Sequence, residues 1–381
     1  MTTLRSPYYD ANHEAFRDQV RRFVRTEIEP HADEWDEAGS FPRELYRKAA
    51  QIGLLQVNFA EELGGVPADR FYSIILHQEL ARGGAGGVGA SLLSHTIGLP
   101  PIIKFGSEAL RRKIVPPVLA GEKIAALAIT EPGAGSDVAN LKTTARRDGD
   151  QYVINGEKTF ITSGIRADYL TVAVRTGGPR MGGISLIVVD GTTPGLSRTP
   201  LRKMGWWASD TATLRFEDCR VPADQLVGAE GIGFKGIIAS FNDERLGLAA
   251  SAIAFAEVCY EEAVKHANLR QTFGKPLSQH QVIRHKLVDM RQRIAASQAM
   301  LELTAWQMDQ GLDPIAAICM LKNQATQTMA FCASEAVQIF GGAGFMRGVK
   351  VERIYREVKV YAIGGGSEEI MKELASRHLG F

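Results

Sequence analysis

The chain has 381 residues, of which 45% are apolar and 23% are charged, a composition typical of globular proteins with a large buried core. Its 44 lysine and arginine residues and 43 aspartate and glutamate residues leave a net charge of +1. Binding to nucleic acid through a basic surface is therefore not indicated, and the length predicts about two to three domains.

The cysteines are scattered along the chain without a C-x-x-C pair: Cys219, Cys259, Cys319 and Cys332. This spacing predicts free, mostly buried thiols in a reducing compartment, and neither disulfides nor a zinc site. The N-terminus lacks the continuous apolar core of a signal peptide, and the apolar stretch 91–103 is too short to span a bilayer. We therefore expect a soluble cytoplasmic protein with no metal site and no membrane span.

An N-terminal helical domain is predicted over residues 1–122. From about residue 12 to residue 119 apolar residues recur at helical spacing, and one such stripe consists of Phe16, Val20, Phe23, Val24 and Ile28. The pair Pro116-Pro117 is expected to end the helical zone, because proline cannot continue a helix.

A middle β-domain is predicted over residues 123–228, where the apolar pattern becomes strand-like. The expected strands are 125–130, 151–154, 158–162, 169–174, 184–189 and 211–216. The pair Asn155-Gly156 predicts a tight hairpin turn, because a type I′ turn needs positive φ at both central residues.

Helices return in residues 229–381, which predicts a C-terminal helical domain. The expected helices are 236–270, about 280–310, about 314–340 and 367–379. Long helices that follow one another along the chain favour an antiparallel bundle.

The stretch TEPGAGSD, residues 130–137, follows a predicted buried strand. A turn formed by its glycines, proline and serine exposes backbone N–H groups and a hydroxyl, which suits an anion or a polarised carbonyl. An ordinary β-turn explains the same residues equally well.

Glu244 is the first candidate for catalysis. At about 100° per residue it projects at the edge of an apolar helical stripe, while Arg245 flanks the other edge; the stripe consists of Phe241, Leu248, Ala252, Phe255 and Cys259. A carboxylate that faces an apolar interior resists ionisation, which suits a general base. The alternative is a buried, purely structural ion pair between Glu244 and an arginine.

Two further stretches combine charge, amide side chains and exposed glycine backbone: RQTFGKPLSQHQ at 270–281 and QIFGGAGF at 338–345. Such groups can hold a ligand that carries a diphosphate. Each alone is a weak signal, because helix ends commonly carry glycine and arginine.

Taken together, these stretches resemble the acyl-CoA dehydrogenase family over essentially the whole chain. TEPGAGSD, NGEKTFITSG, the segment ending in FEDCRVP, RQTFGK, QIFGGAGF and GGGSEEIMKEL follow in the family's order and spacing. The resemblance implies a multidomain α+β fold with an N-terminal helical domain, a middle β-barrel-like domain and a C-terminal four-helix bundle, with FAD between them. It also implies a homotetramer built as a dimer of dimers.

The family reaction is implied as well. A base removes the α-proton of an acyl-CoA thioester, the β-hydrogen leaves as hydride to flavin N5, and electrons pass to an electron-transfer flavoprotein. The residues implied to bind the cofactor are Ile129, Thr130, Ser136, Phe160, Thr162, Arg270, Thr272, Phe273, Gln281, Gln338, Gly341, Gly342, Ser367 and Glu369. Those implied to bind substrate are Ser136, Asn242, Arg245, Gly365 and Gly366. In the family, part of the cofactor site comes from a neighbouring subunit.

One position departs from the family pattern. Most members carry the catalytic glutamate in a Tyr-Glu-Gly-Thr stretch, where this chain has Gly364-Gly365-Gly366-Ser367. Isovaleryl-CoA and long-chain acyl-CoA dehydrogenases instead carry the base in a Glu-Arg pair, which Glu244-Arg245 resembles. We therefore expect Glu244 to act as the base, while Gly365 keeps its backbone N–H as a donor to the thioester oxygen.

Two alternatives to the dehydrogenase remain: a flavin oxidase or monooxygenase on the same fold, and a non-catalytic family member. The small residues of the run 81–95 either leave depth for a longer or branched acyl chain or allow close helix packing. The sequence does not separate these two explanations.

Overall fold

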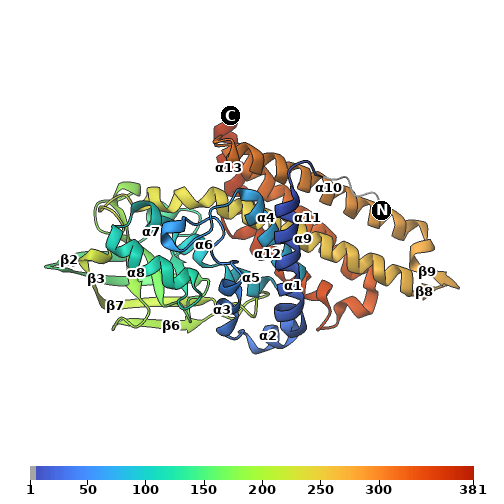
Figure 1. Cartoon of the computed structure of the whole chain (residues 1–381), viewed down its shortest axis with the longest axis horizontal. Helices are drawn as coiled ribbons and strands as arrows, with labels where there is room; N and C mark the ends of the chain where they lie inside the picture. Colours follow the sequence, from blue (N-terminus) through green and yellow to red (C-terminus); the bar gives the residue numbers. More distant parts are fainter. Residues whose placement is uncertain (1–5) are drawn as a thin grey trace.

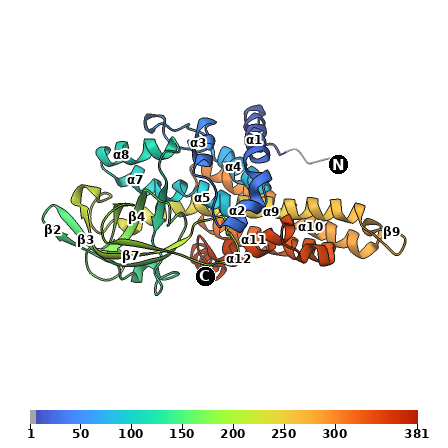
Figure 2. The ribbon, with the colours of Figure 1, turned by 90° about the horizontal axis from the view of Figure 1, so that it is seen from below.

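The computed structural model describes residues 6–381, so residues 1–5 of the predicted first domain lie outside it. A helical region, a β-sheet and a second helical region follow one another along the chain (Figure 1). The sheet forms one end of an elongated molecule, and long helices extend from it to a small hairpin at the other end. Two views at right angles agree on this arrangement (Figure 2).

The first region is helical, as predicted. Its helices are α1 (Ala11–Phe23), α2 (Ala32–Ala38), α3 (Glu44–Gln51), α4 (Arg70–Arg82), α5 (Gly86–Leu92), α6 (His95–Gly98), α7 (Pro100–Phe105) and α8 (Glu108–Leu119). Asp10 caps α1 by accepting hydrogen bonds from two backbone N–H groups of its first turn. The predicted stripe faces the core, because Val20, Phe23, Val24 and Ile28 are buried and Phe16 packs against them.

The helical zone ends at Leu119, close to the predicted Pro116-Pro117, but the expectation that the prolines themselves stop the helix is wrong. Both prolines lie inside α8, which continues to Leu119. The N–H groups that these prolines lack would bond the carbonyls of Arg112 and Lys113, and both of those residues are exposed. Water can satisfy their carbonyls, so the last turn tolerates the proline pair.

The middle region is a single seven-stranded sheet. Its strands are β1 (Ala125–Ala128), β2 (Thr144–Asp148), β3 (Gln151–Ile161), β4 (Tyr169–Arg175), β5 (Ile184–Asp190), β6 (Leu196–Pro200) and β7 (Ala212–Pro222). The order is β1-β4-β2-β3-β7-β6, with β5 beside β4. The pairs β1–β4 and β2–β4 are parallel and the others antiparallel.

The central strands are apolar on both faces because helices cover both. On β4, Ala173 packs into a cluster with α7 and α8, while Val172 and Val174 pack into the cluster that contains α3 and α5. Figure 2 shows α7 and α8 above the sheet. This double burial explains the continuous apolar runs of β4 and β5.

The predicted hairpin turn at Asn155-Gly156 is also wrong. Both residues lie within β3, which runs unbroken through the two strands expected there. The turn between β2 and β3 uses Gly149 and Asp150 instead, since Asp148 pairs with Gln151. At Gly156, φ is +144° and a bulge shifts the register against β7. Glycine at this position therefore allows the neighbouring backbone to approach β3 closely.

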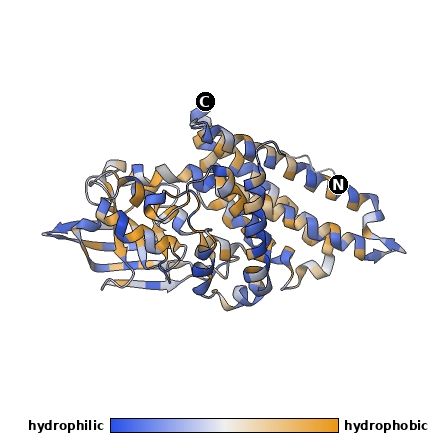
Figure 3. Ribbon diagram, in the orientation of Figure 1, coloured by the Kyte–Doolittle hydropathy of each residue, from blue (hydrophilic) through white to orange (hydrophobic). Residues whose placement is uncertain are grey.

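The last region contains α9 (Gly233–Leu269), α10 (Gln281–Asp309), α11 (Ile315–Phe340), α12 (Lys350–Ile363) and α13 (Glu368–Leu379). The hairpin of β8 (Gln271–Thr272) and β9 (Lys275–Pro276) joins α9 to α10. Helix α11 packs against each of the other four helices, and α9 also packs against α4 and β5. Apolar and polar residues interleave along these helices (Figure 3). Helix α12 was not predicted.

All four cysteines are free and buried, as expected. Within residues 6–381, no helix has the length and apolar character needed to cross a bilayer. The same residues contain no group of three or more histidine, cysteine, aspartate or glutamate side chains arranged to hold a metal ion.

Candidate active site

Glu244 and Gly365 face each other across a narrow space between α9 and the turn that precedes α13. A Cβ atom added at Gly365 would lie 3.8 Å from Glu244 Oε1, 3.9 Å from Arg245 Cγ and 2.7 Å from Leu248 Cδ1. Gly365 has φ of +66°, a conformation that glycine adopts without strain. A side chain at position 365 and the side chain of Glu244 would therefore enter the same space.

The surroundings of Glu244 raise the pKa of its carboxyl group. Its side chain keeps some accessible surface, but most of it lies within protein. Burial raises the pKa of Glu244 to about 7, and the positive charges of Arg245 and Lys322 only partly oppose this shift. A carboxylate with this pKa can accept a proton at neutral pH more readily than an ordinary surface glutamate.

Arg245 does not form the structural ion pair that was the alternative for Glu244. Its Nε donates to the Gly365 carbonyl oxygen at 3.1 Å, and its Nη1 donates to Asn242 Oδ1 at 3.3 Å. Asn242 in turn donates to Asp313 Oδ1 at 3.0 Å. The guanidinium is thus directed to the glycine turn, and no cation lies within ion-pair distance of Glu244 in the described part of the chain.

Lys322 was not among the predicted site residues, yet it lies in the same cluster. It is fully buried on α11 and donates from Nζ to the carbonyl oxygens of Ala362 at 2.9 Å and Gly366 at 2.6 Å. Burial lowers the pKa of Lys322 to about 8. A single lysine on the apolar helix IAAICMLKNQATQTMAF is the sequence signal that could have identified it, because an isolated buried charge needs specific partners.

The turn then leads directly into α13. Ser367 is the N-cap of this helix and accepts a hydrogen bond from the Ile370 N–H, while Glu369 lies exposed in its first turn. Gly366 has φ of +108°, and a Cβ there would lie 2.5 Å from Met371 Cε. The structure therefore brings together the predicted residues Asn242, Glu244, Arg245, Gly365, Gly366 and Ser367.

A second group of predicted residues lies on the sheet. The backbone N–H of Thr159 donates to the Thr130 carbonyl at 2.8 Å, which places Ile129 and Thr130 beside the end of β3, where Phe160 lies and which Thr162 directly follows. Phe160 has φ of +62° and a side chain that is 68% exposed. An exposed aromatic ring at a strained position marks a surface suited to a flat ligand.

The segment that follows Thr130 is a β-turn, because Glu131 and Ala134 exchange both backbone hydrogen bonds. Glu131 also accepts from Lys158 Nζ at 2.7 Å, and both residues are buried. This pair anchors the turn beneath Thr130. Beyond it Ser136 is exposed, so its hydroxyl remains open to a ligand.

The third group lies at the opposite end of the molecule from the sheet, around the β8–β9 hairpin (Figures 1 and 2). It consists of Arg270, Thr272, Phe273, Gln281, Gln338, Gly341 and Gly342. The rings of His266 and Phe340 stack at 4.2 Å, which brings the ends of α9 and α11 together. Phe273 is 96% exposed, and nothing lies near the Cβ positions of Gly341 and Gly342. Within a single chain, this group and the group on the sheet therefore lie far apart.

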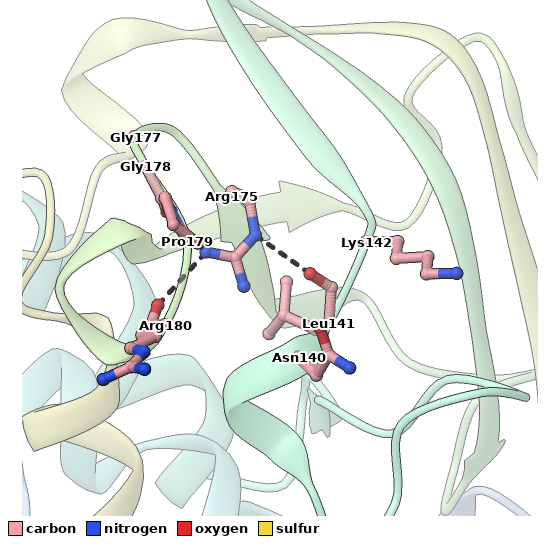
Figure 4. A pocket seen from close by; sticks show the side chains of 8 residues that line it. All are labelled: Asn140, Leu141, Lys142, Arg175, Gly177, Gly178, Pro179 and Arg180. Atoms are coloured by element: carbon pink, nitrogen blue, oxygen red, sulfur yellow. Dashed lines mark hydrogen bonds between the residues drawn. The ribbon is translucent and has the colours of Figure 1, made fainter.

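A hollow of about 400 Å3 lies on the middle region, away from Glu244. Its lining, drawn in Figure 4, consists of Asn140, Leu141, Lys142, Arg175, Gly177, Gly178, Pro179 and Arg180. Arg175 donates to the carbonyl oxygens of Leu141 at 3.0 Å and Arg180 at 3.1 Å. Its guanidinium holds the loop in place, and the hollow contains none of the predicted catalytic residues.

The small residues of the run 81–95 allow close packing. A Cβ at Gly86 would lie 2.6 Å from both Glu357 Oε2 and Trp206 Nε1, and one at Gly87 would lie 3.0 Å from the backbone of Trp206. These glycines let helix α5 approach α12 and the loop before β7. At these two positions the structure favours the packing explanation over added pocket depth.

Comparisons with known proteins agree along the whole chain. Family models described as the N-terminal, middle and C-terminal domains of acyl-CoA dehydrogenase match residues 10–122, 126–219 and 231–380. The chain is 36% identical over 375 residues to the mitochondrial long-chain specific acyl-CoA dehydrogenase of Sus scrofa, covering 97% of this chain and 87% of that protein.

Two solved structures show the same fold. A probable acyl CoA dehydrogenase from Mycobacterium abscessus matches with a TM-score of 0.96 and 46% identity, covering 98% of this chain and 100% of that chain. A glutaryl-CoA dehydrogenase from Mycobacterium smegmatis, in complex with FADH2, matches with a TM-score of 0.92 and 26% identity, covering 98% of this chain and 95% of that chain.

Proposed function

The chain belongs to the acyl-CoA dehydrogenase family, and from this premise we propose how its own residues carry out the reaction. The protein is an oxidoreductase that dehydrogenates an acyl-CoA thioester with a flavin. Glu244 removes the proton from the α-carbon, and the product is the trans-2-enoyl-CoA. The observation that carries this assignment is the place of the Glu244 carboxyl group, 3.8 Å from the position that a Cβ would take at Gly365. Burial there raises the pKa of this carboxyl group to about 7.

The absence of a side chain at Gly365 supports Glu244 as the base. A carboxylate can reach the α-carbon from either wall of the site, at about 3 to 3.5 Å in a reactive geometry. Two carboxylates in that space would repel each other and disturb each other's pKa. With Gly365 on one wall and Glu244 on the other, the site contains a single base and room for the thioester.

Gly365 contributes its backbone N–H to the same step. As the α-proton leaves, the thioester oxygen gains negative charge and needs a preorganised donor. The turn is held from the other side by the bond from Arg245 to the Gly365 carbonyl. Asn242 and Arg245 border the space beside Glu244, and Ser136 lies exposed at the end of the sheet turn.

We propose that the flavin is FAD, bound between two copies of the chain. Its flavin ring would lie against Ile129, Thr130, Phe160 and Thr162, and its diphosphate and adenine against Arg270, Thr272, Phe273, Gln281, Gln338, Gly341 and Gly342 of another copy. The open backbone at Gly341 and Gly342 and the exposed rings of Phe160 and Phe273 fit this division. FAD, when bound, accepts the β-hydrogen as hydride.

The separation of the two residue groups in one chain supports an oligomer, and we propose the homotetramer of the family. Ser367 and Glu369 would close the site at the start of α13. Electrons would pass to an electron-transfer flavoprotein, and the protein would act in the cytoplasm. The domain limits 1–122, 123–228 and 229–381 remain predictions.

The test is anaerobic mixing of the purified yellow protein with saturated acyl-CoA thioesters of increasing chain length and branching. We expect at least one thioester to bleach the flavin absorbance near 450 nm and to give a 2-enoyl-CoA. A protein that takes up no FAD, or whose flavin no acyl-CoA bleaches, would overturn the proposal in favour of a non-catalytic member. Peroxide formed in air at the rate of turnover would instead indicate an oxidase.

A further inference from the structure

We propose that Lys322 is a positioning residue for this reaction: it fixes the Gly364–Gly366 turn against α9, so that the Gly365 N–H and the Glu244 carboxylate act on one thioester. The inference rests on the proposed function, because it concerns the same site. It adds a residue that the sequence motifs do not identify.

Lys322 holds the turn on both sides of Gly365. Its ammonium donates to Ala362 O at 2.9 Å, before the glycines, and to Gly366 O at 2.6 Å, at their end. Between these points Arg245 donates to Gly365 O at 3.1 Å. The neighbour of Lys322 on α11, Asn323, donates to Glu368 O at 3.0 Å. Side chains of α9 and α11 thus bind four backbone carbonyls across residues 362–368.

The turn depends on these donors because it has no side chains of its own to pack. Glycine loses more conformational freedom on folding than any other residue, and residues 364–366 are all glycine. The Gly364 N–H donates to Val360 O at 2.7 Å. Otherwise the backbone of the turn is held by the hydrogen bonds that its carbonyl groups accept from Lys322, Arg245 and Asn323. Without Lys322, the backbone of Gly365 would lose its fixed place beside Glu244.

The charge of Lys322 has a second effect, which a neutral donor would not provide. The charged and titratable groups around Lys322 are Glu368, Arg245, Glu244 and Cys319, and those around Glu244 are Arg245 and Lys322. The ammonium attracts the Glu244 carboxylate and opposes the effect of burial on its pKa. Lys322 therefore favours the ionised base as well as the geometry of the turn.

Two variants separate these effects. Lys322→Met removes the donor and the charge with little change in length, whereas Lys322→Gln keeps a donor but no charge. Thr328→Val is the matched control, because Thr328 is also fully buried on α11 and donates or accepts at 3.0 Å with Ser297 on α10, not with the turn. Each protein, loaded with FAD, is mixed anaerobically with the best acyl-CoA of the wild type between pH 5.5 and 9.5.

We expect Lys322→Met to slow flavin reduction by about 100-fold, the effect of a displacement of about 1 Å at a reacting group. In both Lys322 variants the pH midpoint of the rising rate should move upward from about 7, because the positive charge that opposes the effect of burial on the pKa of Glu244 is lost. Thr328→Val should keep the wild-type rate and midpoint.

Hydrogen exchange gives a readout that does not depend on activity. Amides 364–368 should exchange faster in Lys322→Met than in the control, with Lys322→Gln between them. A wild-type rate of flavin reduction together with a wild-type pH midpoint in Lys322→Gln would overturn the inference. Slow flavin reduction in Lys322→Met with an unshifted pH midpoint and unchanged hydrogen exchange of amides 364–368 would also overturn it. Failure of the wild type to bleach with any acyl-CoA would instead count against the proposed function.

Discussion

Placing a carboxylate at Gly365 while Glu244 is retained tests whether the two positions share one space. The variant is Gly365→Glu, which restores a side chain on the wall that faces the proposed base. Because a Cβ at this position lies 3.8 Å from Glu244 Oε1, the added carboxylate cannot avoid the neighbourhood of Glu244. The two groups should then titrate as a coupled pair.

We estimate the effect for the two carboxylates about 4 Å apart, a distance to which the new glutamate side chain can fold from its Cβ position. Two unit charges about 4 Å apart interact by about 4 kcal/mol at an effective dielectric constant of about 20, and this corresponds to about 3 pKa units at about 1.36 kcal/mol per unit. A like charge disfavours ionisation. The pair should therefore show one apparent pKa raised from about 7, the value of Glu244 with glycine opposite, to 9 or above.

The fold should tolerate the substitution. A non-glycine residue at φ of +66° costs about 1 to 2 kcal/mol in the left-handed region. The closest contact of the new Cβ is Leu248 Cδ1 at 2.7 Å, the end of a flexible side chain that can rotate. A lower melting temperature with retained flavin is the expected outcome.

The assay is the rate of anaerobic flavin reduction by acyl-CoA as a function of pH, with Gly365→Gln as the control. Glutamine has nearly the same shape as glutamate without its charge, so its rate should also fall, but its midpoint should stay near that of the wild type. If Gly365→Glu and Gly365→Gln have the same midpoint, positions 244 and 365 do not share a site and the reasoning is refuted.

Other parts of the structure give further predictions. Lys158→Met should destabilise the fold by about 3 to 5 kcal/mol, because Glu131 keeps a buried charge without its partner; denaturant unfolding measures this, and a loss below about 1 kcal/mol would contradict it. Gly156→Ala should cost more than about 2 kcal/mol, since a Cβ there would lie 2.7 Å from the backbone Cα of Thr143; wild-type stability in the same assay would argue against that packing. Phe273→Ser should leave the monomer folded but lower both oligomer size and bound FAD, because the ring is 96% exposed in one chain; light scattering and the flavin-to-protein ratio check this, and unchanged values would remove Phe273 from the interface.

The long helices were predictable from their own residues. The stripe of α9 that contains Ala252, Phe255 and Cys259 is buried as its spacing indicates, because helical periodicity directly reflects the face that packs. Helix α12 was predictable by the same rule. Its buried residues Val351 and Ile354 are three positions apart, and Val358 follows at four.

The errors came from local signals that tertiary structure overrides. Asn155-Gly156 has the composition of a hairpin turn, but Gly149 and Asp150 form that turn a few residues earlier, and β3 continues through Gly156. The proline pair 116–117 lies where exposed carbonyls one turn earlier can bind water. Neither outcome follows from local propensity alone.

The candidate site was only partly predictable. Glu244 and Gly365 follow from the family pattern, but Lys322 lies on a different helix, and only the fold shows that it reaches the carbonyls of residues 362 and 366. The periodicity of one chain also gives no evidence for the proposed contact between the β8–β9 hairpin and the sheet of another copy. Such a contact would form only when copies of the chain assemble, and no single position in the sequence indicates it.

The most direct test of Glu244 as the base is the rate of flavin reduction in Glu244→Gln. Without the carboxylate we predict a fall of about 100-fold to 10,000-fold, the usual contribution of a general base, with FAD content and binding of enoyl-CoA retained. Asp243→Asn is the control, because the adjacent carboxylate is exposed and pairs with Arg70 at 2.9 Å; it should react at the wild-type rate. Bleaching of Glu244→Gln at the wild-type rate would contradict the account.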